Sequence, residues 1–292
     1  MNILVCGANG FVGRHLLAGL QLAGHHCIPA LRTPRNPDER AIDYLHDLIP
    51  QQWLSKLQGV DVVINAVGVL RDSRSQPMQK ILAQAPAALF KACAQAGVKR
   101  IINISALGVE SLLMTPYFQR RRESEAVLFA LPPSLCWLNL RPSVIYGEDG
   151  ASARMFRLLA SLPLHLLPMG GFQQLQPVHI DDVVEAVCRW LADERAHSQS
   201  VNAAGAQATT MRGMLDSYRA QSGRGQAWHL PVPGVLIRLC ARLGNVVPLS
   251  PLCTDTLTML NAGNTGDMHA FAQLLGRTPQ SYQDFIKADK RG

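Results

Sequence analysis

Residues 2–16 read NILVCGANGFVGRHL, and this stretch decides the fold that we expect. Its apolar run 3–6 predicts a β-strand, which leads through Gly7, Gly10 and Gly13 into a segment with helical periodicity. The start of a helix offers unpaired N–H groups and a partial positive charge, which together suit a pyrophosphate. Gly7 permits a sharp exit from the strand, Gly10 lets the backbone approach a phosphate, and Gly13 lets the helix pack closely on the strand. The stretch therefore predicts a dinucleotide-binding strand, turn and helix.

The first half of the chain alternates between apolar runs and helical segments, as β-α-β units around a parallel sheet do. We expect strands at 3–6, 26–32, 41–46, 60–67, 100–105 and 135–141, and helices at 11–24, 50–59, 77–97 and 117–131. Pro86 should bend or divide the helix 77–97, because proline removes a helical hydrogen bond. The predicted fold class is α/β, a doubly wound Rossmann-type parallel sheet with a smaller C-terminal region.

Prolines and glycines become frequent after Gly147, which marks a change in organisation. We expect residues 1–150 to form a dinucleotide-binding domain and residues 151–292 to form a smaller substrate or cap region. Residues 176–205 are expected to return to the first domain. The cap is apolar with few charges over 147–171 and 211–288, which favours a neutral or lipophilic small-molecule substrate over a sugar nucleotide.

Composition narrows the classes of function. The chain has 292 residues, 48% of them hydrophobic and 17% charged, which is typical of a globular protein. Its net charge is +7, but the arginines are dispersed and are not interleaved with aromatics, so we do not expect a nucleic-acid partner. The seven cysteines are scattered without a C-x-x-C pair, which favours free core thiols over a disulfide framework or a metal site.

No stretch approaches the ~18 uninterrupted apolar residues of a membrane span, so we expect no transmembrane segment. Met1 leads directly into the first strand, without the charged and apolar pattern of a leader. A cytoplasmic location is therefore expected.

Arg32 stands at the end of the second predicted strand, where NAD-binding chains of this fold carry an acid for the ribose 2′-hydroxyl. Arg35 follows closely, and the strand end itself has no carboxylate. Because a guanidinium matches a phosphate geometrically, we expect NADP(H) to be preferred, with NAD(H) as a possible cofactor. Arg14 is a further candidate for a phosphate contact. The alternative for Arg32 is a solvated arginine on a loop.

Several ordered motifs resemble the extended and atypical branches of the short-chain dehydrogenase/reductase superfamily, which includes epimerase- and dehydratase-like chains. They are the spacing G-x-x-G-x-x-G from Gly7, the strand end NISALG at 103–108, RPSVIYG at 141–147 and PVHIDDV at 177–183. The resemblance spans residues 1 to about 205. Among subgroups, the segment around Tyr117 is similar to the atypical members, including the NADPH-binding accessory subunit of respiratory complex I.

The resemblance implies a catalytic set of Ser105, Tyr117 and Arg121. In the superfamily the serine orients the substrate oxygen and the tyrosine transfers the proton. A lysine four residues after the tyrosine holds the nicotinamide ribose and lowers the tyrosine pKa by its positive charge. This chain carries Arg121 there, which keeps the charge but not the geometry of an ammonium.

The resemblance also implies cofactor contacts at other strand ends. Asp47 and Leu48 correspond to the site of the adenine amino group, although Asp47 as a helix N-cap is the alternative. Small residues at 66–68 would let the cofactor lie against the backbone, and the loop after 141 would meet the carboxamide. The complete predicted cofactor-binding set is Gly7, Asn9, Gly10, Phe11, Val12, Gly13, Arg14, Arg32, Asp47, Leu48, Ala66, Val67, Gly68, Ser105, Tyr117, Arg121, Pro142 and Val144.

Three functions are consistent with these motifs. The first is an NADP(H)-dependent oxidoreductase acting on a carbonyl or alcohol, favoured by Ser105, Tyr117 and the nicotinamide-side loop. The second is a catalytically weak or inactive NADPH-binding protein with a structural, sensing or assembly role and a protein partner, favoured by Arg121. The third and weakest is an NAD-dependent epimerase or dehydratase, against which Arg32 argues.

Overall fold

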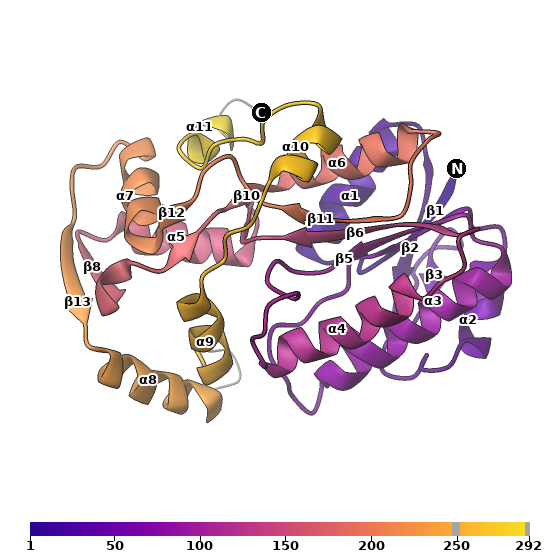
Figure 1. Cartoon of the computed structure of the whole chain (residues 1–292), viewed down its shortest axis with the longest axis horizontal. Coiled ribbons are helices and arrows are strands. Elements are labelled where there is room, and N and C mark those ends of the chain that lie inside the picture. The colour runs from indigo at the N-terminus through magenta and orange to yellow at the C-terminus, as the bar shows by residue number, and fades with distance from the viewer. Residues whose placement is uncertain (247–251, 290–292) are drawn as a thin grey trace. The chain divides into compact units, whose positions relative to one another are not determined.

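The computed structural model describes residues 1–246 and 252–289, and it contains a seven-stranded sheet of order β11-β6-β5-β4-β1-β2-β3 (Figure 1). Every pairing from β6 across to β3 is parallel. The strands are β1 (Asn2–Cys6), β2 (His26–Leu31), β3 (Arg40–Ala41), β4 (Val62–Asn65), β5 (Arg100–Ile104), β6 (Cys136–Pro142) and β11 (Gln199–Ala203). This sheet and its flanking helices confirm the predicted α/β Rossmann-type fold.

The apolar runs of the sequence form the strands at the buried centre of the sheet. Nearly all residues of β1, β4 and β5 are buried, as expected where helices cover both faces of a parallel sheet. Strand order reverses around β1, which pairs with β2 on one side and with β4 on the other. In doubly wound folds ligands bind beyond the carboxyl ends of the strands at such a reversal.

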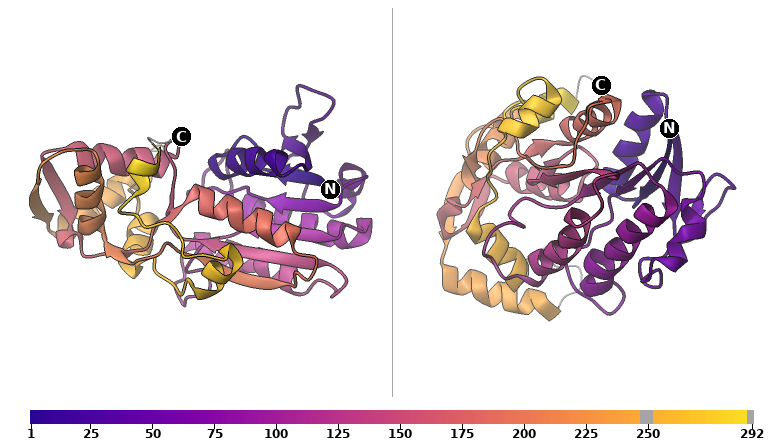
Figure 2. Two further views of the ribbon diagram at one scale, coloured as in Figure 1. Left: turned by 90° about the horizontal axis from the view of Figure 1, so that it is seen from above. Right: turned by 45° about the vertical axis from the view of Figure 1, so that its right-hand side comes forward.

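Helices lie on both faces of the sheet, with α1 and α6 on one side and α3 and α4 on the other (Figures 1 and 2). Gly19 of α1 lies against Val184 of α6, and the absence of a side chain at Gly19 permits this close approach. The helices are α1 (Phe11–Leu22), α2 (Gln51–Leu54), α3 (Ala85–Ala96), α4 (Pro116–Phe129) and α6 (Ile180–Ala192), with a 3-10 turn at Ser55–Leu57.

The long helix predicted at 77–97 changes its helical type next to Pro86. A π-helical segment covers Gln79–Gln84, and α3 begins at Ala85 with Pro86 in its first turn. The backbone stays helical across the junction, where the Ala85 N–H donates to the Lys80 carbonyl five residues earlier. Pro86 therefore coincides with a change of helical type, and the helix is not interrupted there.

The strand predicted at 41–46 is wrong beyond Ala41, because the chain turns immediately afterwards. The Asp43 carboxylate accepts a hydrogen bond from the Leu45 N–H at 2.9 Å, and the Asp43 carbonyl accepts from the N–H groups of His46 and Asp47. An aspartate that bonds to the backbone two residues on favours a turn over a strand.

The chain forms two compact units, Met1–Arg141 with Val184–Val201 and Pro142–Val183 with Asn202–Gly292. The functional division expected from the sequence, a dinucleotide domain at 1–150 with 176–205 and a cap at 151–292, stays a prediction. Among the described residues, no helix is long and apolar enough to cross a bilayer.

The second unit has its own core and three strand pairs. Tyr146, Tyr218 and Phe285 pack together at its centre, with Tyr146 stacked on Phe285 at 4.9 Å between ring centroids. Its strands are β7 (Ile145–Tyr146) with β10 (Val178–His179), β8 (Leu164–Pro168) with β13 (Trp228–Val232), and β9 (Gln174–Leu175) with β12 (Thr209–Thr210). Its helices are α5 (Ala151–Ser161), α7 (Met211–Gln221), α8 (Gly234–Val246), α9 (Thr254–Ala262), α10 (His269–Leu275) and α11 (Phe285–Asp289).

The glycine turn after β1 is packed so tightly that two of its glycines admit no side chain. A Cβ on Gly13 would lie 2.1 Å from the Gly7 carbonyl oxygen, and one on Gly7 would lie 2.8 Å from the Ala66 carbonyl. Gly7 also has a φ of +84°, in the left-handed region that favours glycine. Both roles expected from the sequence, the sharp exit at Gly7 and close helix packing at Gly13, are therefore visible in the backbone.

The Gly13→Ala variant should lower the free energy of unfolding by about 1–3 kcal/mol, because main chain rather than a flexible side chain must move to admit the methyl group. Gly225→Ala is the matched control, since a Cβ there meets nothing within 4 Å. Urea denaturation of both variants checks this. Equal stability of the two variants would contradict the close-packing argument.

Candidate functional site

A pocket of about 590 Å³ opens at the carboxyl ends of β1, β2 and β4. Its volume lies within the range of small-molecule and cofactor pockets. It is lined by Gly7, Ala8, Asn9, Gly10, Ala30, Leu31, Arg32, Thr33, Arg35, Glu39, Ile42, Asp43, Tyr44, Leu45, Ala66, Val67, Gly68, Val69, Ser75, Gln76 and Ile81. Seven of the predicted cofactor residues are therefore together in one cavity: Gly7, Asn9, Gly10, Arg32, Ala66, Val67 and Gly68.

The N-terminus of α1 is bare main chain. Gly10 is its N-cap and, having no side chain, makes no capping hydrogen bond. The first N–H groups of a helix lack partners within the helix, so an uncapped start beside a cavity suits an anion. A glycine cradle of this kind fits the pyrophosphate of a dinucleotide.

The other predicted residues of this helix do not line the pocket. Phe11, Val12 and Gly13 form its first turn. The Arg14 guanidinium donates to the Asn9 carbonyl at 3.0 Å and so braces the glycine loop.

Arg32 and Arg35 are exposed at the pocket wall after β2, together with two carboxylates. The Arg35 N–H hydrogen bond to Glu39, at 2.5 Å, lowers the pKa of that carboxyl. Although partial burial opposes it, hydrogen bonds from His46 and the Leu45 N–H lower the pKa of Asp43. The wall thus carries two arginines, together with two carboxyl groups whose pKa values lie below their ordinary range.

Asp47 and Leu48 lie outside the pocket lining, whereas Asp43 lies within it. The buried Asp47 carboxylate accepts from Lys56 Nζ at 2.5 Å and from the Asp43 N–H at 2.6 Å. Asp47 does not cap α2, whose N-cap is Pro50. The carboxylate therefore holds the turn that presents Asp43, and its predicted adenine contact stays a prediction.

Tyr117 and Arg121 lie one turn apart on α4, and both are buried. The Arg121 guanidinium sits over the Tyr117 ring, with 5.6 Å between its Cζ and the ring centroid. Its nitrogens donate to the Ile104 carbonyl at 3.0 Å and to the Val67 carbonyl at 3.4 Å. Arg121 thus joins the ends of β4 and β5 beside the pocket residue Gly68, where a Cβ would lie 2.8 Å from its Nη2. Its Nε is buried without a hydrogen-bond partner among the described residues.

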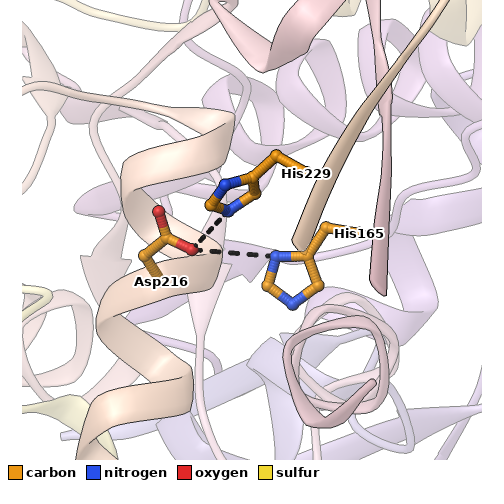
Figure 3. Close-up of side chains that lie close together, drawn as sticks. All are labelled: His165, Asp216 and His229. Atoms are coloured by element: carbon orange, nitrogen blue, oxygen red, sulfur yellow. Dashed lines mark hydrogen bonds and ion pairs between the residues drawn. The ribbon is translucent and has the colours of Figure 1, made fainter. Parts of the chain in front are cut away.

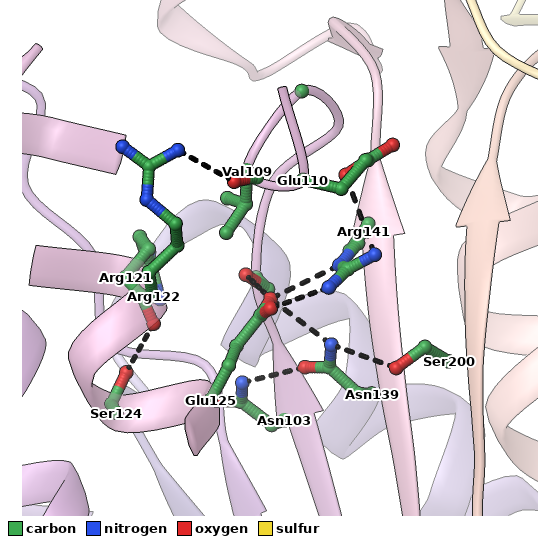
Figure 4. Close-up of polar contacts among 12 residues, drawn as sticks. Asn103, Val109, Glu110, Arg121, Arg122, Ser124, Glu125, Asn139, Arg141 and Ser200 are labelled. Carbon is green, nitrogen blue, oxygen red and sulfur yellow. Dashed lines mark hydrogen bonds and ion pairs between the residues drawn. The ribbon is translucent and has the colours of Figure 1, made fainter. Parts of the chain in front are cut away.

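Ser105 is bound by a partner that the sequence did not predict. Its hydroxyl donates to the buried Glu125 carboxylate at 2.5 Å. Glu125 also receives a two-pronged ion pair from Arg141, at 3.1 and 2.6 Å, and a hydrogen bond from Asn139 Nδ2 at 3.0 Å (Figure 4). Glu110 contacts the other side of Arg141 at 3.3 Å. The hydroxyl proton of Ser105 therefore lies in its hydrogen bond to the Glu125 carboxylate.

Asparagines on three adjacent strands form a continuous row. Asn65, Asn103 and Asn139 stand in register on β4, β5 and β6. Asn65 Nδ2 donates to Asn103 Oδ1, and Asn103 Nδ2 donates to Asn139 Oδ1, each at 2.8 Å. Tyr44, in the pocket wall, donates its hydroxyl to Asn65 at 2.8 Å. The row therefore connects the pocket with Glu125.

The sequence did not predict the hydrogen-bond network of Glu125 and the three asparagines, because its members are far apart along the chain. Each asparagine follows apolar strand residues (VVIN, RIIN and WLN), and a buried amide at such a position is costly unless it is hydrogen-bonded. Their pairing follows only from strand order and register.

Pro142 and Val144, predicted to meet the cofactor, belong to the second unit, where the Val144 N–H donates to Asn264 Oδ1 at 2.9 Å.

One cluster among the described residues has potential metal ligands within reach of one another: His165, Asp216 and His229 in the second unit (Figure 3). His229 Nε2 lies 2.7 Å and His165 Nδ1 3.7 Å from the same Asp216 oxygen, while Arg212 approaches the other oxygen at 3.7 Å. Both His165 nitrogens are buried without a hydrogen-bond partner among the described residues, and burial lowers the pKa of this ring. We interpret the cluster as a tie between α7 and the β8–β13 pair; the absence of a metal site stays a prediction.

Glu125→Gln should lower the free energy of unfolding by about 3–5 kcal/mol, because it removes the buried partner of Arg141 and leaves that charge poorly compensated. Glu123→Gln on the same helix is the matched control. Its ion pair with Arg120 is surface-exposed, so the loss should stay below about 1 kcal/mol. Chemical denaturation measures both, and a small loss at Glu125 would show that the network is not a stability element.

Comparisons with known proteins agree with this geometry. A family model described as the NAD dependent epimerase/dehydratase family matches residues 3–204. The ceramide reductase of Caulobacter vibrioides is 27% identical over 196 residues, which cover 64% of this chain and 61% of that protein. The mitochondrial NADH dehydrogenase (ubiquinone) 1 alpha subcomplex subunit 9 of Rattus norvegicus is 26% identical over 197 residues, covering 63% of this chain and 51% of that subunit. The matches thus span only about half to three fifths of these relatives.

Solved structures support the fold. Human epimerase family protein SDR39U1, solved with NADPH, matches with a TM-score of 0.75 at 19% identity, over 100% of both chains. A nucleoside-diphosphate-sugar epimerase from Staphylococcus aureus matches with a TM-score of 0.76 at 18% identity, over 98% of this chain and 100% of that one. The motif-based resemblance is confirmed: the chain belongs to the NAD dependent epimerase/dehydratase family of extended and atypical short-chain dehydrogenase/reductases, and its family binds a nicotinamide dinucleotide.

Proposed function

We propose that the protein is an NADP(H)-dependent oxidoreductase acting on a neutral or lipophilic carbonyl or alcohol. The observation that carries this proposal is the buried Arg121 guanidinium, held against the Tyr117 ring and beside the pocket residue Gly68. Arg121 thus places a cation one helical turn after a tyrosine, at the position that the superfamily lysine occupies, and the tyrosine hydroxyl would be the proton-transfer group. The cytoplasmic location stays a prediction.

The glycine cradle and the two arginines after β2 support the cofactor assignment. The bare N-terminus of α1 would hold the pyrophosphate, and Arg32 with Arg35 would hold a 2′-phosphate. A bound nicotinamide supplies hydride transfer, and the protein supplies binding and orientation. SDR39U1 was solved with NADPH, whereas the structural neighbour MoeE5 was solved with UDP-glucuronic acid and NAD, so the preference for NADP(H) rests on these arginines.

At the reacting end, Tyr117 would give or take the proton of the substrate oxygen. Ser105 donates its own proton to Glu125, so its oxygen offers lone pairs as hydrogen-bond acceptors. A serine in this state orients a substrate hydroxyl better than a carbonyl. The geometry therefore favours the alcohol form of the substrate at Ser105.

A second function is favoured by the hydrogen bonds of Arg121. Two of its nitrogens bond the Ile104 and Val67 carbonyls. A guanidinium held by main chain serves as a brace, which fits an NADPH-binding protein without turnover and with a structural, sensing or assembly role. The name of the complex I relative is consistent with a protein partner for such a role.

Arg32→Ala should weaken NADPH binding about tenfold to a hundredfold, because a charge-assisted hydrogen bond contributes about 1.5–3 kcal/mol. NADH binding should change little. Thermal-shift titrations with both dinucleotides check this, with Arg195→Ala as a control on another exposed arginine. Equal losses for the two cofactors would remove the 2′-phosphate assignment.

Arg121→Lys should raise the turnover of a responsive carbonyl or alcohol substrate by about tenfold or more, within the range that proton-transfer catalysis supplies. Arg122→Lys is the matched control, because Arg122 ties the α4 helix to the carbonyls of 109, 111 and 113 and to the Met114 sulfur. NADPH oxidation is the readout across a substrate panel. Unchanged turnover in a variant that still binds NADPH would favour the second function.

A further inference from the structure

Helix α8 is apolar on two opposite faces. Ile237 and Ala241 are buried and pack with Leu257 of α9. On the other side Val235, Leu236, Leu239 and Leu243 are exposed, between 51% and 68% of their surface. A helix at a protein surface ordinarily has one apolar stripe, which faces the core. The second stripe of α8, which we call the α8 outer face, has no partner of its own among the described residues.

The four side chains of the α8 outer face form one strip. At about 100° per residue, positions 235, 236, 239 and 243 fall within an arc of about 100°. Isolated exposed leucines are ordinary, but a contiguous apolar strip marks an interaction site.

Charge on the same helix identifies the kind of partner. Arg238 and Arg242 are exposed, one turn apart, and they flank the outer face along one edge. Residues 234–246 contain no aspartate or glutamate. A helix with an apolar strip bordered by arginines and without acids is complementary to a bilayer that carries anionic headgroups.

The strand that precedes α8 in the chain carries further exposed apolar side chains. Trp228 and Leu230 of β13 stand beside Leu164 and Leu166 of β8, and all four are exposed, Trp228 at 81%. The alternate residues His165 and His229 point to the opposite side of this pair, toward Asp216 of α7 (Figure 3). Tryptophan is enriched at the level of lipid headgroups.

We propose that the α8 outer face docks the protein on the surface of an anionic lipid bilayer, with the helix lying in the headgroup region. The four apolar side chains enter the bilayer boundary, and Arg238 and Arg242 contact lipid phosphates. This attachment is distinct from membrane spanning, and it holds whether or not the protein turns over a substrate.

Flotation of the full chain with vesicles tests the proposal. Vesicles of equal parts phosphatidylcholine and phosphatidylglycerol should bind the protein, and vesicles of phosphatidylcholine alone should bind it much more weakly. Replacing both arginines (Arg238→Gln with Arg242→Gln) should lower partitioning to the anionic vesicles roughly thirtyfold, since each basic side chain contributes about a fivefold effect near such a surface. Arg195→Gln with Arg224→Gln is the control, with two exposed arginines elsewhere.

The apolar contribution is tested separately. Leu236→Gln with Leu239→Gln should lower partitioning roughly a hundredfold. Leu22→Gln with Leu112→Gln removes two leucines that are even more exposed, and should leave partitioning unchanged. Unaltered thermal unfolding of every variant ensures that folding is not at issue.

Three results would overturn the proposal. The first is equal partitioning of the α8 variants and the unaltered protein, and the second is no partitioning to either type of vesicle. The third is a concentration-dependent dimer, measured by light scattering, that the Leu236→Gln with Leu239→Gln variant abolishes. That result would assign the face to a second copy of the chain.

Discussion

The buried carboxylate of Glu125 is the constraint on which the first unit depends. A charge taken out of water must be compensated in full, because the free energy of leaving it unpaired exceeds most single packing contributions. Arg141, Asn139 and Ser105 supply that compensation from β6 and from the end of β5. Helix α4, which carries Glu125, is thereby locked to the sheet, and so are Tyr117 and Arg121. The positions of Tyr117 and Arg121 at the proposed reacting end thus follow from the hydrogen bonds and the ion pair that the Glu125 carboxylate requires.

Much of the fold was predictable from the sequence, because close main-chain contacts and strand burial leave a direct pattern in it. Glycines at 7 and 13 sit where main chain meets main chain, so no other residue type fits, and the motif predicts the turn reliably. The apolar strands are covered on both faces and therefore read as unbroken hydrophobic runs. The short β3 was less predictable, because side-chain hydrogen bonds from Asp43 compete with strand pairing over only a few residues.

The candidate site was predictable only in part, for a different reason. The pocket residues follow directly after strands whose ends meet at one edge, so Arg32 and the small residues at 66–68 could be placed from topology. Glu125 could not, since its partners come from two other segments of the chain, Ser105 after β5 and Asn139 with Arg141 on β6. Asp47 and Asp43 lie four residues apart around one turn, and only the hydrogen bonds of Asp47 distinguish the buried carboxylate from the one that reaches the pocket.

The row of asparagines also has a direction. Asn65 donates to Asn103, Asn103 donates to Asn139, and Asn139 donates to Glu125, so the three amide dipoles align head to tail toward the Glu125 anion. Aligned hydrogen bonds polarise one another, and the anion at one end dictates the sense of the whole series. The series begins at the Tyr44 hydroxyl, whose proton is consequently turned inward. A carboxylate on α4, reached through asparagines on three strands, thus sets the direction in which Tyr44 of the pocket wall donates its hydroxyl proton.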